Sequence, residues 1–486
     1  MSAFTYNSSV TTVGKDTDPE TVYYNADIIA NAQNISSLGI GKDPVVRFSE
    51  TRSTPILSDS SKYEFSIIRF TMNGSGKDLP MFIPSIDVNQ SDINMTTYSV
   101  RLNHTIYYVH PTTSANESVT FTAQRYVVFK PEVAGALLPN PPNTVNAQGK
   151  KQGQDLRGAY YYVYTYNHWV QLCNNALRDA WNDAELPVPN TPHPTKSIQG
   201  QWGDYWTSIG GSSGNQPILQ STPPYLSYNE NNGLFTIYGD TYCCGNNPRG
   251  GQPPPWSAWS WNNGTPVYAD GGATPPTQGT ELMRVYFNTN MFGLFANFPN
   301  YWKGSEDPLG LTYEILFFNK GTNNVFEPDK FNAFSSTSGQ KLAPSAGGVF
   351  YWAMEQDYNS TSTLWSPISS IVFTSTVLPI IPEQVGTPIQ LGFGNDNASN
   401  PSASDFAPII TDIALANNRA DDYRGFIAYN PTAEYRMVSL TASKQELRSI
   451  DIQVFWKNRL DNRLYPITMF NLSSVSIKIM FRKKRT

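Results

Sequence analysis

The stretch between residues 448 and 482 constrains the fold of this chain more than any other, because apolar and polar side chains alternate along it. One face of its first half carries Ile450, Ile452, Val454 and Trp456. The other face carries Asp451, Gln453 and Lys457. After a polar loop at 457–463 and a short strand at 464–470, the alternation returns with Val475, Ile477, Ile479 and Phe481. A period of two indicates half-buried β-strands, so this stretch predicts the closing strands of a sheet.

Further strands are predicted upstream, and most of them follow one another without an intervening helix. Their ranges are 44–56, 62–72, 79–86, 96–110, 117–130, 233–238, 311–318, 348–354, 370–378, 409–415, 424–429 and 435–440. Closely spaced strands of this kind are typical of antiparallel sandwiches and barrels. The sequence therefore predicts an all-β protein.

One helix interrupts this pattern. Its apolar residues recur at helical spacing: Tyr166, Trp169, Val170, Cys173, Leu177, Ala180 and Trp181. This spacing places them on one face, which we expect to be core, and Pro187 and Pro189 end the helix. Residues 291–298 indicate a second helix of one or two turns.

Shifts in composition divide the chain into six parts. These are a polar N-terminal arm at 1–42, the first part of a sandwich at 43–135, a linker at 136–158, a helix-led insertion domain at 159–280, the second part of the sandwich at 281–482, and a basic tail at 483–486. The arm has little apolar periodicity, so we expect it to become ordered only against a neighbouring subunit. The insertion is rich in Trp, Pro and Gly, and long insertions of this kind are usually functional or disordered.

The low charge of the chain favours contacts with other proteins. Only 15% of the residues are charged, while 13% are aromatic, which suits a protein packed against copies of itself. A net charge of −5 argues against a generally nucleic-acid-binding surface. The three cysteines, two of them adjacent, offer no disulfide framework and indicate a reducing compartment. No leader segment is expected, because the first residues form neither a basic nor an apolar region. No membrane span is expected either, since the most apolar run, at 371–381, is short and contains Pro379.

Two groups of residues are candidates for contact with a ligand or partner. The first is the set of tryptophans in the insertion: Trp202, Trp206, Trp256, Trp259 and Trp261. Indole faces stack on sugar rings, but tryptophans also pack loops and subunit contacts. The second group is the basic run Arg482, Lys483, Lys484 and Arg485. Such a run is a solvated chain end, a subunit contact, an import signal or a salt-sensitive phosphate contact.

No catalytic, cofactor or metal site is predicted. The four histidines and three cysteines have no metal-ligand spacing. A nucleophile elbow, a phosphate loop and a dinucleotide-binding glycine motif are all missing from the sequence. Paired carboxylates of a glycoside hydrolase would meet only in space, so that class is a remote alternative.

Several blocks of the sequence carry a family resemblance. They are 48–57 with 63–70, the helix start at 166–169, 286–288 with 294–295, 365–368 through 378–379, 450–457 and 476–482. In these blocks the chain resembles the minor capsid, or penton, proteins of virophages and polinton-like viruses, which are tailless double-stranded DNA viruses with jelly-roll capsids. The resemblance implies one jelly-roll β-sandwich with an outward-facing insertion, pentamers at the capsid vertices, and no catalytic residues. The Trp-rich part of the insertion lies outside the resemblance.

These observations predict a structural protein of the virion, assembled in the cytoplasm (a virus factory) or the nucleus of the host cell. Its expected partners are four further copies of itself, the major capsid protein and other capsid components. Packaged DNA at the C-terminal tail and a host glycan at the tryptophans are further candidate partners. Two alternatives stay open: a major capsid protein of the same lineage, with two jelly rolls and trimeric assembly, or a carbohydrate-binding attachment module.

Overall fold

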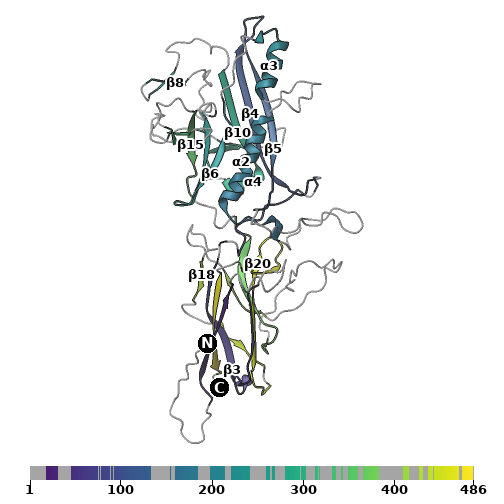
Figure 1. Ribbon diagram of the computed structural model, residues 1–486, viewed down its shortest axis with the longest axis vertical. Helices are drawn as coiled ribbons and strands as arrows, with labels where there is room; N and C mark the ends of the chain where they lie inside the picture. The colour runs from purple at the N-terminus through teal and green to yellow at the C-terminus, as the bar shows by residue number, and fades with distance from the viewer. Residues whose placement is uncertain are drawn as a thin grey trace.

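The computed structural model of the chain is elongated and has two lobes stacked along its long axis (Figure 1). It describes residues 18–30, 45–74, 76, 78–87, 89–90, 92–132, 154, 159–183, 198–213, 221–240, 243, 259–262, 265–268, 280–295, 297–302, 312–315, 317, 331–334, 341–342, 349–358, 365–381, 409–414, 426–430, 436–441, 443–469 and 473–484. Within them, antiparallel strands dominate and helices are few. The prediction of a mainly antiparallel β protein is therefore confirmed.

The lower lobe contains two antiparallel sheets. The β22 sheet has the order β1 (Thr21–Ile29), β22 (Ser474–Lys483), β3 (Tyr63–Asn73) and β18 (Phe426–Tyr429), and β19 (Val438–Ser439) also pairs with β3. The β20 sheet has the order β17 (Ile409–Ala414), β16 (Ile368–Thr374), β20 (Ser449–Asn458) and β2 (Arg47–Thr51), and β21 (Leu464–Pro466) also pairs with β20. A short 3₁₀ helix, η1 (Ser60–Lys62), precedes β3.

The core of the lower lobe lies between these two sheets. The apolar face of β20 and the apolar face of β22 are both almost fully buried, as their alternation predicts. The rings of Phe70 on β3 and Phe373 on β16 meet edge to face at 5.1 Å, and those of Tyr24 and Phe48 meet at 5.8 Å. Edge-to-face pairs at this distance are favourable beyond the area they bury.

The upper lobe is built from residues between β3 and β16. Its β4 sheet has the order β11 (Asn300–Trp302), β12 (Thr312–Ile315), β10 (Thr280–Asn288), β4 (Met95–Val109) and β5 (Asn116–Val128). Its β7 sheet has the order β14 (Lys341–Leu342), β13 (Phe331–Phe334), β15 (Val349–Glu355), β7 (Leu234–Asp240) and β6 (Tyr225–Asn229). A separate two-stranded sheet pairs β8 (Trp259–Asn262) with β9 (Thr265–Tyr268).

Helix α2 (Tyr166–Asn182) is the helix that the apolar spacing predicts. Thr165 caps it, since its side chain accepts a hydrogen bond from the backbone N–H of His168. Its buried stripe, which includes Trp169, Cys173 and Leu177, packs on β4, β5 and β6. The upper lobe also contains η2 (Ala159–Tyr161), α3 (Ile198–Ser208) and α4 (Thr289–Phe295).

The expected N-terminal arm differs from the structure in its described part. Residues 21–29 form β1, which pairs with β22 along its full length, and Val22, Tyr24 and Ala26 are buried. The apolar face of β1 was overlooked because two of its outward residues, Tyr23 and Ile29, are also apolar and blur the alternation. The other residues of the predicted arm, apart from 18–20 and 30, lie outside the described residues.

The expected sandwich boundaries also differ from the sheets. We predicted that 43–135 and 281–482 build one sandwich, but β4 and β5 pair with β10 in an upper-lobe sheet. Alternation identifies a strand and its buried face, but it does not identify the partner strand. The strand predicted at 79–86 forms only isolated bridges, Phe82 to Val163 and Ile86 to Thr96. Of the predicted linker at 136–158, the structure describes Gln154 alone, whose side chain bonds Pro84 O and the N–H of Ile86.

Candidate functional site

The basic C-terminal run is held by contacts within the lower lobe. Arg482 donates from Nε and Nη2 to Glu64 Oε1, at 3.1 and 2.7 Å. Lys483 Nζ donates to the carbonyl oxygen of Asp18 at 2.9 Å, and Lys484 Nζ donates to that of Leu440 at 3.1 Å. The hydrogen bonds of these three cations therefore connect the end of β22 to β3, to the segment before β1 and to the segment after β19. Arg485 lies outside the described residues.

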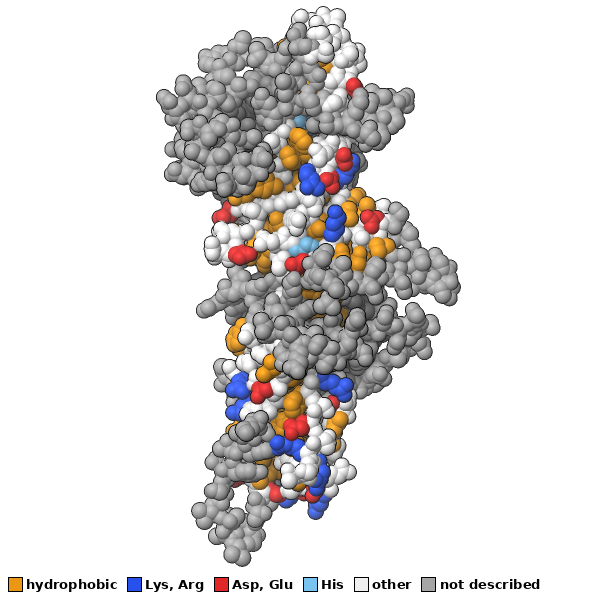
Figure 2. Space-filling view, viewed as in Figure 1, with side chains coloured by type: hydrophobic (Ala, Val, Ile, Leu, Met, Phe, Trp, Pro, Cys, Tyr) orange, Lys and Arg blue, Asp and Glu red, His pale blue; other side chains and the backbone are white. Residues whose placement is uncertain are grey.

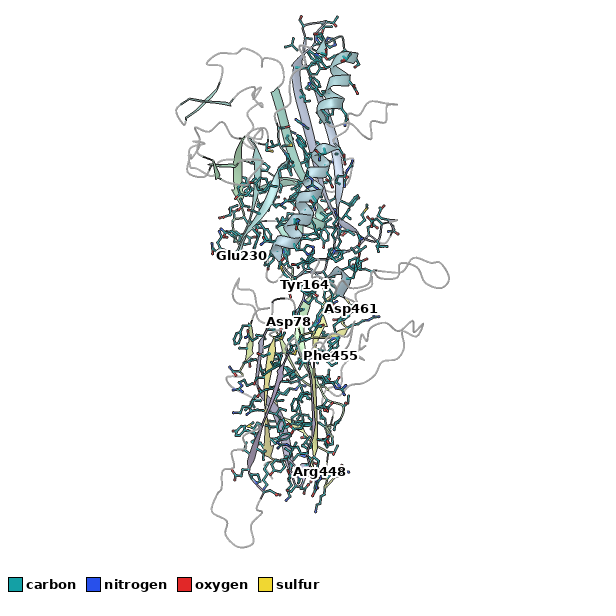
Figure 3. All side chains as sticks on the ribbon, in the orientation of Figure 1. Asp78, Tyr164, Glu230, Arg448, Phe455 and Asp461 are labelled. Atoms are coloured by element: carbon teal, nitrogen blue, oxygen red, sulfur yellow. The ribbon has the colours of Figure 1, made fainter. Side chains whose placement is uncertain are left out.

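Further ion pairs lie at the lower lobe. Lys62 Nζ is 3.0 Å from Asp18 Oδ2, and Arg448 Nη2 is 2.6 Å from Glu446 Oε2. Figure 3 places Arg448 near the lower end of the molecule, and Figure 2 shows red and blue side chains intermixed on the visible face of this lobe. Exposed pairs of this kind contribute about 0–1 kcal/mol each, and they leave the two signs of charge interspersed. In the described part of the lower lobe, these pairs therefore do not gather positive charge into one patch that would bind a polyanion.

A buried tyrosine joins the two lower sheets. Tyr24 on β1 donates its hydroxyl hydrogen to Glu50 Oε2 on β2, and Arg52 Nε donates to Glu50 Oε1 at 2.9 Å. The hydrogen bond from Tyr24 lowers the pKa of Glu50, and burial raises the pKa of Tyr24 well above its ordinary value. The contact fixes the relative position of β1 and β2.

A second carboxylate is fully buried on the β20 sheet. Asp451 accepts hydrogen bonds from the hydroxyl of Ser375, from N and Oγ1 of Thr376 at 3.0 and 2.8 Å, and from the N–H of Val377 at 2.9 Å. Burial alone would raise the pKa of Asp451, but these donors outweigh it and the pKa is lowered. The carboxylate thus holds the turn that follows β16.

The junction between the lobes combines polar and aromatic contacts, and Figure 3 labels Asp78 and Tyr164 within it. Ser473 donates to Asp78 Oδ1 at 2.7 Å, and both side chains are buried. The backbone N–H of Arg459 donates to Pro367 O at 2.7 Å, beside the second segment that crosses between the lobes. The ring of Trp456 stacks on Tyr465 at 4.9 Å and meets Tyr162 of the upper lobe edge to face at 5.9 Å. These contacts fix how the upper lobe stands on the lower one.

Two of the candidate tryptophans lie in the interior. Trp202 and Trp206 lie on α3 and are 0% and 1% exposed. Their rings contact Tyr108 at 5.5 and 6.2 Å, and the Trp206 indole N–H donates to Ser212 O. They therefore pack α3 against β4, which differs from the contact role we expected of them. We did not predict α3 because Gly200 and Gly203 interrupt its apolar pattern.

The side chains of the other three tryptophans lie outside the described part of the structure. Trp259 and Trp261 belong to β8, where each pairs through its backbone with β9, and the structure describes nothing of their side chains. Trp256 lies outside the described residues. The candidate tryptophans are therefore not brought together into one described surface.

Exposed apolar side chains occur elsewhere in the described parts of both lobes. The most exposed are Tyr358 at 64%, Ile29 at 63%, Leu460 at 62%, Phe426 at 60%, Tyr301 at 55% and Val377 at 48%. Figure 2 shows apolar side chains on the described surface of both lobes. Ile29, Phe426 and Tyr301 lie on strands, and the other three lie in turns or bends. Sequence alone did not identify them, because exposure depends on how distant segments pack together.

Neither metal ligation nor membrane insertion is supported by the described ranges. They contain no group of three or more His, Cys, Asp or Glu side chains that would hold a metal ion. In the same ranges no helix has both the length and the hydrophobicity to cross a bilayer.

Comparison with known proteins gives consistent matches. The family model described as Sputnik minor capsid protein V18/19 matches residues 22–483. Protein V18 of the Sputnik virophage is 28% identical over 172 residues, which cover 35% of this chain and 88% of V18. A chain in the cryo-EM structure of the Sputnik virophage is 19% identical, with a TM-score of 0.60 and coverage of 96% of this chain and 98% of that one. The mavirus penton protein matches with 14% identity and a TM-score of 0.47 over 96% of this chain and 100% of that one.

Proposed function

The chain belongs to the Sputnik minor capsid protein V18/19 family, and from this premise we propose that five copies of it close a ring at each vertex of an icosahedral capsid. The family is one of capsid structural proteins, so the chain is a component of the virion and not an enzyme. Its partners are other components of the capsid. The proposal adds the copy number, the vertex position and the fold of the lower lobe.

The lower lobe is the jelly roll in this proposal. Its two sheets consist mostly of strands that are far apart in sequence, as in β1-β22-β3-β18 and β17-β16-β20-β2. A jelly roll has eight strands in two sheets joined by long crossing connections, which corresponds here to these two rows of four, with the short β19 and β21 added to them. The chain then divides into a jelly roll at 18–73 and 368–484 and a projecting lobe at 74–367.

The strand order of the upper lobe favours a vertex protein over a major capsid protein. Half of the eight strand pairs in its two sheets join strands that are neighbours in sequence: β4 with β5, β6 with β7, β11 with β12, and β13 with β14. Hairpins of this kind differ from the crossing order of the lower sheets. With one jelly roll per chain, the arrangement supports assembly as pentamers. It is less suited to the trimers expected of a chain with two jelly rolls.

The contacts of the candidate ligand residues do not favour a second function. Trp202 and Trp206 are buried, so they offer no surface to a glycan. Arg482, Lys483 and Lys484 are committed to protein acceptors, so they do not form an open site for packaged DNA. We therefore propose a role in capsid assembly and no second role in binding a glycan or DNA.

Light scattering of the purified protein tests the copy number. With a chain mass of 54.1 kDa, a ring of five has a mass of about 270 kDa. We expect this species, or a monomer that reaches it on concentration. A stable species of about 162 kDa, three times 54.1 kDa, would identify a trimer and overturn the proposal.

A further inference from the structure

The two edges of the β22 sheet carry exposed apolar residues at the same level. Ile29, 63% exposed, is the last residue of β1, and Phe426, 60% exposed, is the first residue of β18. Among the described strands, these two form opposite edges of the sheet. The pairing register connects them through one row, in which Ile29 pairs with Ser474, Ser474 with Asn73, and Asn73 with Phe426.

Both side chains also lie on the same face of the sheet. Ile28 and Ile427 pack towards the core, so their neighbours Ile29 and Phe426 point away from it. The two residues between them in the row, Ser474 and Asn73, are polar. Since neighbouring strands are about 4.8 Å apart, the row places the apolar ends about 14 Å from each other, too far to contact within one chain.

The position of Ile29 and Phe426 in one cross-strand row is what a contact within a closed ring requires. In a cyclic ring each subunit uses two different patches, one for each neighbour, and the operation that relates the copies is a rotation without translation. The patches that meet must therefore lie at the same height along the ring axis. When the long axis of the molecule stands along that axis, residues in one cross-strand row of the β22 sheet satisfy this condition.

We propose that Phe426 on the β18 edge of one subunit packs against the β1 edge at Ile29 of the next subunit, so that this contact forms the seam of the ring. The inference rests on the proposed pentamer and names its contact. Exposed apolar residues at sheet edges are a liability unless a partner covers them. The occupant of both edges is a second copy of this chain, because only identical copies bring opposite ends of one row together all around a ring.

Crosslinking tests the seam directly. A chain that carries Ile29→Cys and Phe426→Cys together should, after treatment with a short bismaleimide, give a ladder that ends at five linked chains. Each single variant should stay uncrosslinked, and a mixture of the two single variants should stop at pairs. The wild-type chain, which keeps its native cysteines, and a Leu460→Cys/Phe426→Cys chain are the controls. Leu460 is 62% exposed but lies on the loop between β20 and β21.

Charge substitution provides a second readout. Ile29→Asp and Phe426→Asp should each raise the protein concentration needed for half-assembly by about tenfold or more, since buried apolar anchors dominate interface energies. Leu460→Asp, with a matched loss of an exposed apolar side chain, should leave assembly unchanged. A 270 kDa ring that forms without this crosslink and tolerates both aspartates would overturn the seam and leave the pentamer standing. Absence of any such ring would instead overturn the proposed function.

Discussion

Ser473 donates a hydrogen bond of 2.7 Å to Oδ1 of Asp78, across 395 positions of the sequence. Ser473 directly precedes β22, and Asp78 lies in the segment that leaves β3 for the upper lobe. The backbone of Ser473 also accepts a hydrogen bond from Ala30 N–H at 2.9 Å, just beyond β1. Ser473 therefore connects three segments: the end of β1, the start of β22, and the segment that leads from β3 to the upper lobe.

Ser473→Ala should lower the free energy of unfolding by about 1–3 kcal/mol, because it leaves a buried carboxylate with one donor fewer. The matched control is Ser58→Ala, since Ser58 makes the same type of hydrogen bond to Asp18 at 2.6 Å in an exposed position. That change should cost less than about 0.5 kcal/mol. Urea unfolding of both variants measures the difference. Equal losses of unfolding free energy in the two variants would contradict the prediction that the buried hydrogen bond contributes more than the exposed one.

Asp451→Asn should reduce stability most at neutral pH. Burial works against the carboxylate, but the donors around it lower its folded pKa below the ordinary value, so its contribution is present above about pH 4 and is lost as the pH falls through the folded pKa. The difference in stability between wild type and Asp451→Asn should therefore become smaller below about pH 4. Unfolding midpoints across the acid range measure this.

The control for that series is Asp412→Asn, which removes an exposed carboxylate 3.5 Å from Arg436. It should shift the midpoint little at any pH. A gap between wild type and Asp451→Asn that is the same at pH 3 and pH 7 would contradict the role given to the buried carboxylate.

Trp202→Ala should cost about 3–5 kcal/mol of stability, as expected for removing a fully buried indole. Trp302→Ala is the matched comparison, because Trp302 is 44% exposed on β11. It should cost clearly less. Thermal or urea unfolding measures both variants, and a mild effect of Trp202→Ala would contradict its place in the core between α3 and β4.

Lys483→Gln should loosen the lower end of β1 without changing DNA binding. The substitution removes the ammonium donor to Asp18 O, so hydrogen exchange at residues 18–22 should become faster. Retention on a duplex DNA column at low salt should equal that of wild type and of Lys130→Gln, an exposed control. A selective loss of DNA retention in Lys483→Gln would restore the phosphate-contact hypothesis for the tail.

Sequence patterns predicted individual strands better than their partners. The alternation at Ile450 to Trp456 identified β20 and its buried face, and the stripe at Trp169 and Cys173 identified α2. Nothing in β4 indicated that it pairs with β10 and not with a lower-lobe strand, because pairing is set by contacts far apart in sequence. For the same reason the exposure of Ile29 and Phe426 was not predictable.

Fold and family were nonetheless predictable together. The strand-rich pattern is confirmed as antiparallel β-structure, and the family resemblance is confirmed by a match over residues 22–483. The tryptophans misled the site prediction because an indole suits a sugar-binding face and a protein core equally well. The burial of Trp202 depends on α3 folding back onto β4, which composition does not reveal.

The strand order also determines when the lower sheets can be completed during synthesis of the chain. Strand β22 lies between β1 and β3, and β20 lies between β16 and β2, so strands made late by the ribosome fill central positions of both lower sheets. Chains fold during synthesis from the N-terminal side, at about 5–20 residues per second. The upper lobe is complete in the nascent chain before β20 and β22 have been made. A nascent chain therefore cannot complete either lower sheet until its translation is nearly over.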